Sequence, residues 1–343
     1  MYFKILNASM EHYGFQFKEG LNVETNPFNP SRFDFTDREH LFEYAGNGML
    51  IADVEIPNNA RTVKMENLHC WRTNQIILSN IRPLEDFVSS LSLDEINHWI
   101  QYNGLTLRFV KQQTPELCAE AVKQNCMALQ FVKEQTPELC MVAVKNHSCA
   151  LQYVKEQTPT LCLKAVKQNG NVLQFVNDQT RNLCLIALKQ NGLALQFVKE
   201  QTPELCLVAV KNHSYALQYV KEQTPELCLR VLKQNGLIIQ FVKEQTPELC
   251  LTAVKQNGYA LQDVKEQTTE ICIEAVKQNG KALQFVKEQT VEICIEAVKQ
   301  NGRALQFVKE QTVEICIEAV KRNKQVLQYV DYKQIGYDYT VLL

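Results

Sequence analysis

The sequence predicts a mainly α protein, in which an α-solenoid of about ten two-helix repeats follows a small N-terminal α+β domain. A fixed period of about 20 to 50 residues is the signature of a repeat architecture. The first hundred residues lack this period and contain short apolar runs that are typical of strands. Ten cysteines define the period, since they recur every 22 residues without an insertion: Cys118, Cys140, Cys162, Cys184, Cys206, Cys228, Cys250, Cys272, Cys294 and Cys316.

Each repeat is predicted to form two short helices. Thr202-Pro203-Glu204 is typical of a helix start, because threonine caps a helix, proline fits the first turn and an acid suits the dipole. Lys211 falls in the last turn, and the Asn-Gly pair that follows in most copies predicts a left-handed stop. In the second helix, one face carries Ala216, Leu217, Tyr219 and Val220, and Gln218 lies outside it. A helix of about nine residues is marginal alone, so stacking on neighbours must stabilise it.

The repeated cysteines are predicted to be core residues with no redox or metal role. They share an apolar helical face with a recurring alanine, and a full helical pair separates successive copies, which is too far for a disulfide. A glutamine five residues before each cysteine never varies, and its amide is expected to bond the backbone of the tight turn and to reach the adjacent unit. The alternative is an exposed glutamine retained by recent duplication. These residues are Gln113, Gln135, Gln157, Gln179, Gln201, Gln223, Gln245, Gln267, Gln289 and Gln311.

The pattern divides the chain into four segments. These are a small α+β head at 1–84, a degenerate capping repeat at 85–106, ten repeats at 107–326, and a partial repeat with a C-terminal cap at 327–343. Within the head we expect strands at residues 15–17, 50–56 and 73–78, and a helix at 37–44.

Composition narrows the class of protein. Charged residues are 22% of the 343, with 36 basic and 38 acidic side chains, which is a globular balance and excludes a disordered tail or a general polyanion binder. No segment reaches the roughly 18 consecutive apolar residues of a membrane span. Met1 to Leu6 lack a charged segment followed by an apolar core, so we expect no secretory signal and a reducing cytoplasm.

Two positions vary between copies and form the candidate partner-binding surface, although neutral drift at exposed sites is an equal alternative. The first variable row lies on the first helices and becomes acidic along the array: Glu120, Val142, Lys164, Ile186, Val208, Arg230, Thr252, Glu274, Glu296 and Glu318. The second variable row begins the second helices and changes from mostly apolar to polar or basic: Met127, Cys149, Asn171, Leu193, Tyr215, Leu237, Tyr259, Lys281, Arg303 and Gln325. Leu193, Tyr215, Leu237 and Tyr259 complete the candidate surface.

The sequence predicts no catalytic, cofactor-binding or metal-binding residue. The head offers His12, His40, His69 and Cys70 with Asp34, Asp37 and Glu43. No glycine-rich phosphate loop, metal-ligand spacing or nucleophile motif organises these side chains. Nucleic acid is not an expected partner either, because a typical copy has two lysines against two glutamates and therefore no continuous basic stripe.

The repeat, as it runs from Leu195 to Cys206, closely resembles an uncharacterised helical repeat family of giant amoeba-infecting viruses of the mimivirus group, over about residues 85–330. The head, with Gly14 to Asn22 and Phe35-Thr36-Asp37, resembles the module that these viruses place before ankyrin and other repeats. The resemblance implies origin and fold and brings no established activity.

These observations favour a non-catalytic scaffold for protein-protein interaction, which engages host proteins in the cytoplasm of the host cell. One alternative is an enzymatic, transferase-like head targeted by the array. Another is a self-assembling structural protein, since the end of the chain is aromatic and could form a homodimer or a cap. The residues concerned are Tyr329, Tyr332, Tyr337, Tyr339 and 341–343.

Overall fold

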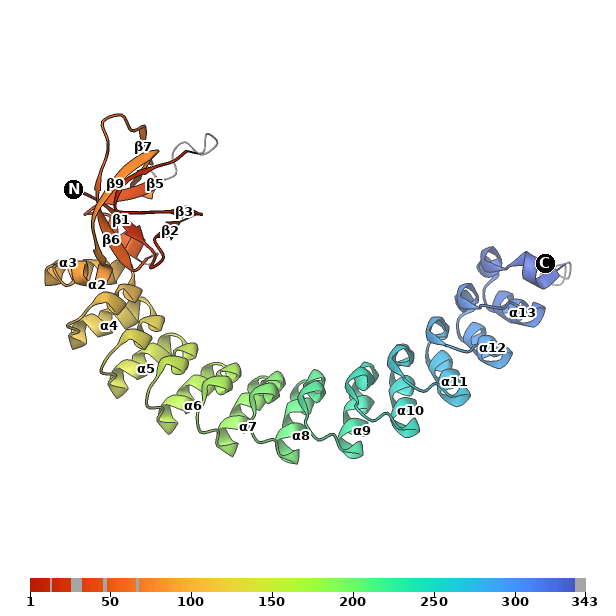
Figure 1. Ribbon diagram of the computed structural model, residues 1–343. Coiled ribbons are helices and arrows are strands. Elements are labelled where there is room, and N and C mark those ends of the chain that lie inside the picture. Colours follow the sequence, from red (N-terminus) through yellow and green to blue (C-terminus); the bar gives the residue numbers. More distant parts are fainter. Residues whose placement is uncertain (13, 26–32, 46–47, 66–67, 337–343) are drawn as a thin grey trace. The chain divides into compact units, whose positions relative to one another are not determined.

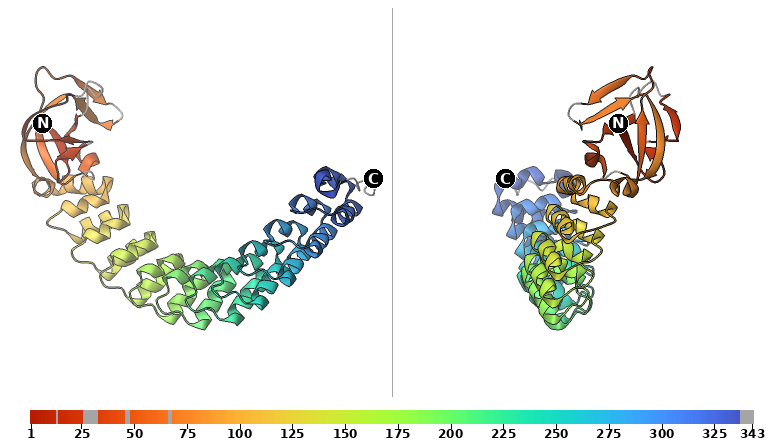
Figure 2. Two further views of the ribbon diagram at one scale, coloured as in Figure 1. Left: turned by 45° about the vertical axis from the view of Figure 1, so that its right-hand side comes forward. Right: turned by 90° about the vertical axis from the view of Figure 1, so that its left-hand side faces the viewer.

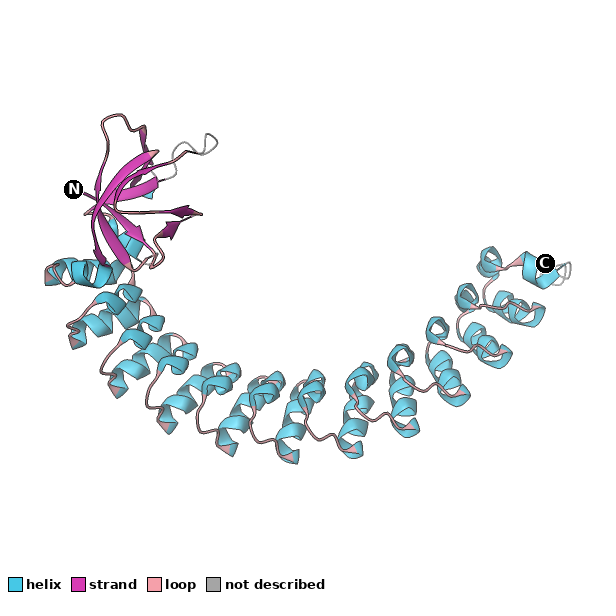
Figure 3. Ribbon diagram, viewed as in Figure 1, coloured by secondary structure: helices cyan, strands magenta, loops and turns pink. Residues whose placement is uncertain are grey.

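The computed structural model describes residues 1–12, 14–25, 33–45, 48–65 and 68–336, with strands in the head and helices after it (Figures 1 and 3). The chain forms two compact units, Met1–Gln168 with Phe175–Asn177, and Asn169–Gln174 with Asp178–Leu343. The first unit contains the head and the earlier repeats, and the second contains the later repeats. This confirms a helical repeat array with a small, sheet-rich N-terminal domain.

The head is built on a seven-stranded antiparallel sheet with the order β4-β9-β6-β1-β5-β8-β7, seen from two further sides in Figure 2. Alternation buries one face, so that Leu6, Phe33 and Ile76 share a core. A separate hairpin pairs β2 (Glu11–His12) with β3 (Phe15–Gln16). The strands of the sheet are β1 (Tyr2–Leu6), β4 (Gly20–Val23), β5 (Phe33–Asp37), β6 (Leu50–Glu55), β7 (Thr62–Met65), β8 (Cys70–Thr73) and β9 (Gln75–Pro83).

The prediction of a helix at 37–44 is correct only for its last four residues. Strand β5 runs through Asp37, which pairs with Tyr2 of β1, and the helix that follows, α1, is only Leu41–Tyr44. Burial of Phe35 explains the difference, because pairing in the sheet outweighs the local preference of a polar segment. The strands expected at 15–17 and 50–56 correspond to β3 and β6, and the one expected at 73–78 falls across the end of β8 and the start of β9.

Each repeat combines an α-helix of ten residues with a six-residue 3₁₀ helix, after the short α2 (Leu84–Val88) and α3 (Leu93–Tyr102). The α-helices are α4 (Pro115–Gln124), α5 (Pro137–Asn146), α6 (Pro159–Gln168), α7 (Arg181–Gln190), α8 (Pro203–Asn212), α9 (Pro225–Gln234), α10 (Pro247–Gln256), α11 (Thr269–Gln278), α12 (Val291–Gln300) and α13 (Val313–Arg322). The 3₁₀ helices are η3 (Gly104–Phe109), η4 (Cys126–Phe131), η5 (Ser148–Tyr153), η6 (Gly170–Phe175), η7 (Gly192–Phe197), η8 (Ser214–Tyr219), η9 (Gly236–Phe241), η10 (Gly258–Asp263), η11 (Gly280–Phe285), η12 (Gly302–Phe307) and η13 (Lys324–Tyr329).

The Asn-Gly pair does not make the left-handed stop that the sequence predicts. Asn191 ends α7 in an extended conformation with φ −143°, and its Oδ1 accepts the N–H of Leu193 at 3.0 Å, which caps η7. Gly192 is needed for space, because a Cβ there would lie 2.3 Å from the carbonyl oxygen of Ala209 in the next α-helix. The glycine therefore serves the contact between repeats.

The ten repeated cysteines are all buried and have free thiols. Burial raises the pKa of the Cys294 and Cys316 thiols to about 11, which keeps them protonated and unreactive. The prediction that these residues pack the core is confirmed.

The repeated glutamines bridge neighbouring repeats, as predicted. Gln267 Nε2 donates to the carbonyl oxygens of Leu261 at 3.2 Å and Phe285 at 3.0 Å. Its Oε1 accepts the N–H of Lys287, in the next repeat, at 3.0 Å. Equivalent bonds to the next repeat recur from Gln113 to Gln311. Each amide therefore pairs with a backbone carbonyl oxygen and a backbone N–H in the turn of the next repeat.

The last helix of the described residues is α14 (Tyr332–Ile335). Gln334 of this short helix accepts the N–H of Gln311 at 2.7 Å, so α14 covers the last repeat. Tyr337, Tyr339 and 341–343 lie outside the described residues, and a homodimer through this end stays a prediction.

Candidate partner-binding surface

The variable positions lie on two different rows of helices. Within each unit the α-helices stack side by side in one row and the 3₁₀ helices in another (Figure 1). Every residue of both variable rows is exposed or half-buried, and Val142 and Tyr215 reach 43% and 39% exposure. The first variable row follows the α-helices and the second follows the 3₁₀ helices. The predicted surface is therefore accessible, and its binding role stays a prediction.

The aromatic members of the second variable row rest on the next repeat. Tyr215 contacts the ring of Phe241 edge-on with 5.7 Å between centroids, and Tyr259 contacts Phe285 in the same way at 5.9 Å. Such edge-on pairs are favourable, so these rings are held in place while part of each stays open to solvent.

The acidic end of the first variable row is neutralised locally. Glu274, Glu296 and Glu318 each lie within 3.5 Å of the lysine three residues later in the same helix. The hydrogen bond from Lys321 lowers the pKa of the Glu318 carboxyl. The last three copies thus carry paired charges in place of a uniformly acidic surface, and exposed pairs of this kind contribute little to stability.

A lysine two residues after most of the 3₁₀ helices makes contacts between repeats. Lys243 Nζ donates to the carbonyl oxygen of Lys221 at 2.6 Å, and Lys287 Nζ donates to that of Lys265 at 2.8 Å. These ammonium groups cover backbone oxygens of the preceding repeat, so they link neighbours along the array.

Two clefts open between successive α-helices at their N-terminal ends. A cleft of about 350 Å³ lies between α8 and α9, and one of about 560 Å³ lies between α4 and α5. The two occupy equivalent places 88 residues apart, and each includes one member of the first variable row, Arg230 or Val142. The first cleft is lined by Pro203, Leu207 and Leu227 together with charged side chains.

The close glycine contact is absent from three junctions between repeats, and the clefts occur at two of them. Glycine is replaced by Cys126, Ser148 and Ser214 in three inner copies, and the clefts lie next to the first and third of these. Val231 also replaces the alanine that this glycine would touch.

Three carboxylates among the candidate residues of the head each pair with an arginine or a histidine. Asp34 Oδ1 accepts from Arg72 Nε at 2.7 Å, while Asp37 and Glu43 each bond the Nδ1 of one histidine, His40 or His69, at 2.8 Å. Cys70 is buried, which raises the pKa of its thiol, and His12 is exposed.

One buried lysine of the head was not predicted from the sequence. Lys4, in the middle of β1, is only 2% exposed and lines a cavity of about 240 Å³ with Asp34, Tyr44 and Cys70. Its Nζ donates to the carbonyl oxygen of Asp34 at 2.7 Å. Burial lowers the pKa of Lys4 to about 8, although the charge of Asp34 opposes this. A lone lysine in a strand is usually exposed, so the sequence carried no signal for this residue.

We expect Lys4→Met to stabilise the head by about 2 kcal/mol near pH 7, because it removes a buried charge and loses one hydrogen bond. Between pH of about 8 and 10.5 the unfolded chain binds a proton at Lys4 that the folded chain does not, so the free energy of unfolding of the natural protein rises with pH in this window. Urea unfolding followed by the fluorescence of Trp71 and Trp99 measures both effects. Lys18→Met, at an exposed lysine, is the control; an unchanged pH slope in Lys4→Met would contradict the prediction.

No helix in the part of the chain that the structure describes has both the length and the apolar character needed to cross a bilayer.

Comparison with known proteins points to one group of viruses. The chain is 32% identical over 97 residues to a protein of Acanthamoeba polyphaga mimivirus named as an ankyrin repeat protein, R868; the match covers 25% of this chain and 48% of that protein, about half its length. It is also 32% identical over 96 residues to the uncharacterised mimivirus protein R869, covering 25% of this chain and 70% of the relative. No solved structure matches the chain.

The repeats match a family model described as a domain of unknown function, DUF4116. The matches are at residues 114–158, 158–202, 180–224, 224–268, 246–291, 268–312 and 290–334. They cover more than half of the chain and follow its 22-residue spacing. The resemblance to a repeat family of mimivirus is confirmed, and the chain belongs to the DUF4116 family.

Proposed function

We propose that the protein is a non-catalytic scaffold whose repeats bind a protein partner, and that this partner is a host protein in the cytoplasm of an infected cell. The viral relatives, one of them named as an ankyrin repeat protein, support a repeat scaffold. Repeat arrays bind through surfaces made of equivalent positions in successive units. The buried, reduced thiols agree with a reducing compartment.

One observation carries the proposal. The residues that hold the repeats together are nearly constant, whereas the first variable row is open to solvent and changes from copy to copy. Two members of this row, Val142 and Arg230, lie at clefts that combine apolar and charged groups. A constant frame with varied side chains at a fixed spacing is suited to recognise one extended surface.

We expect substitutions along the first variable row to weaken partner binding about tenfold or more. The full chain is used to isolate partners from infected cells, and affinity for the purified partner is then measured. The test variant combines Val208→Lys, Arg230→Glu and Thr252→Lys, which change three neighbouring exposed or half-buried positions of the second unit.

The matched control is Gln196→Ala, Gln218→Ala and Gln240→Ala, at exposed positions of the 3₁₀ helices in the same repeats. It should bind like the natural protein. Equal affinity of both variants, with unchanged circular dichroism, would place binding elsewhere and contradict the proposal.

A further inference from the structure

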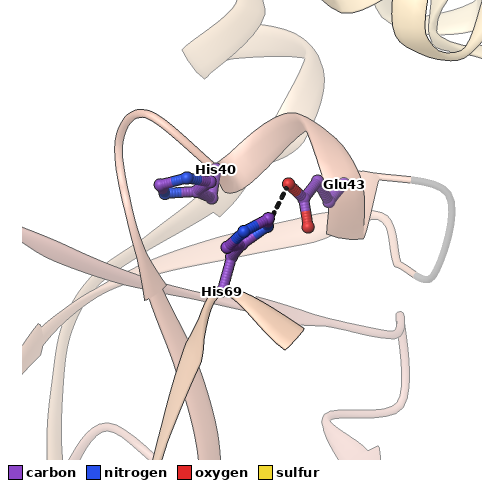
Figure 4. A group of neighbouring side chains, drawn as sticks. All are labelled: His40, Glu43 and His69. Carbon is purple, nitrogen blue, oxygen red and sulfur yellow. Dashed lines mark hydrogen bonds and ion pairs between the residues drawn. The ribbon is translucent and has the colours of Figure 1, made fainter. Parts of the chain in front are cut away.

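The folded head brings together four polar residues, three from one short segment and a fourth from a distant part of the sequence. Asp37 ends β5, His40 precedes α1, Glu43 lies in α1 and His69 directly precedes β8. Strands β5 and β8 are antiparallel neighbours, so the end of one lies beside the start of the other. Figure 4 shows His69 facing Glu43, with His40 beside them.

The distances suit a small cation. One ligand atom from each of His40, Glu43 and His69 lies within 4.8 Å of the other two. His69 Nδ1 and Glu43 Oε1 are 2.8 Å apart, and the two imidazole rings stack with 4.4 Å between centroids. Two imidazoles and a carboxylate form a ligand set that Zn²⁺ accepts, with a fourth position left for water.

Asp37 supplies the outer contact that such sites need. Its Oδ1 bonds His40 Nδ1 at 2.8 Å and also accepts the backbone N–H of His40 at 3.0 Å. With Nδ1 engaged, His40 presents Nε2 as its remaining ligand atom. A carboxylate that orients a histidine in this way is the common outer partner of a zinc ligand.

The backbone at His69 is a second, independent observation. His69 has φ +46°, in the left-handed region that non-glycine residues rarely adopt. Its carbonyl oxygen accepts from Thr36 Oγ1 at 2.9 Å, which ties this conformation to β5. Strained backbone of this kind collects at functional sites, because the surrounding structure must hold it there.

We propose that His40, Glu43 and His69 bind a zinc ion, with Asp37 as the residue that orients His40. The ion takes the place of the hydrogen bond between His69 and Glu43, and its charge balances that of the Asp37 and Glu43 carboxylates, which here contact imidazoles. The stacked rings must tilt for their lone pairs to converge, and His69, with a side chain 54% exposed, has room to turn. The bound ion links α1 to the strand pair β5 and β8.

Titration of the metal-free full chain with zinc chloride tests the proposal. We expect one ion per chain at this site, at least about tenfold weaker binding in His40→Ala and in His69→Ala, and a loss of about tenfold in Asp37→Asn. His147→Ala, at an exposed histidine of the repeats, should bind zinc like the natural chain. Unchanged affinity in His40→Ala and His69→Ala overturns the proposal.

The cysteines require their own control, because thiolates also bind zinc. Cys149 is exposed and Cys126 half-buried, so the double variant Cys126→Ser, Cys149→Ser is titrated in parallel. It should keep the site, and loss of zinc binding in this variant overturns the proposal. Substitution by cobalt gives a second readout, with visible absorption of histidine and carboxylate ligands and no thiolate charge-transfer band. Trp71 fluorescence shows that each head variant is folded, since this residue lies in β8.

Discussion

Gly236→Ala is expected to destabilise the repeat array by about 3 kcal/mol. The added Cβ would lie 2.2 Å from the carbonyl oxygen of Ala253 and 3.0 Å from Gln256 Oε1. The first neighbour is helix backbone and cannot move alone, so α10 must shift as a whole. The Gly236 N–H also donates to Gln256 at 2.7 Å, and this bond is strained by the same shift. Urea unfolding followed by circular dichroism at 222 nm measures the change.

Two other substitutions serve as comparisons for the loss of stability in Gly236→Ala. Gly302→Ala should cost less, because its Cβ would lie 2.8 Å from the carbonyl oxygen of Ala319. Ser214→Ala changes the equivalent residue in a copy that already has a Cβ, and it should stay within about 0.5 kcal/mol of the natural protein. A cost for Gly236→Ala no larger than that for Ser214→Ala would show that the close contact is unimportant.

Gln267→Leu is expected to lower the free energy of unfolding by about 2 to 3 kcal/mol. Leucine keeps much of the volume and leaves the carbonyl oxygens of Leu261 and Phe285 and the N–H of Lys287 without their amide partner. Each polar group left unpaired in a half-buried turn is unfavourable. The loss falls on the contact between two repeats, so cooperativity of unfolding should also decrease.

Gln284→Leu provides the matched control. This glutamine is exposed and bonds only within its own 3₁₀ helix, to the carbonyl oxygen of Lys281 at 3.1 Å. Its replacement should shift the unfolding midpoint little. If the two variants unfold at the same urea concentration, the amide bridge does not stabilise the array. Recent duplication would then explain why the glutamine never varies.

The repeats could be predicted from the sequence because their information is local and repeated ten times. The helix start at Thr202, the buried face with Cys206 and the reach of the glutamines follow from spacing alone, and the structure confirms them. The role of Gly192 could not be predicted in this way. Its neighbour is the carbonyl oxygen of Ala209, and a contact between repeats leaves no mark in the conformation of either residue.

The head lacks such repetition, and its features depend on pairing between distant segments. Asp37 belongs to a strand because Tyr2 lies opposite, and Lys4 is buried because the sheet closes around it. The approach of His69 to Glu43 joins residues 26 positions apart through the strand pairing of β5 and β8. The candidate residues were all visible in the sequence, but their grouping was set by the topology of the sheet.

The glutamine bridge also limits which changes in the length of the repeat array are compatible with the fold. Each copy supplies an amide to the copy after it and receives one from the copy before, with partners 18 and 20 residues away. An insertion that is not a multiple of 22 residues would leave the glutamine amide and its backbone partners without each other, whereas one whole extra repeat restores every bond. Gain or loss of complete copies is therefore the form of change that the protein tolerates, and α14 can close an array of any number of units.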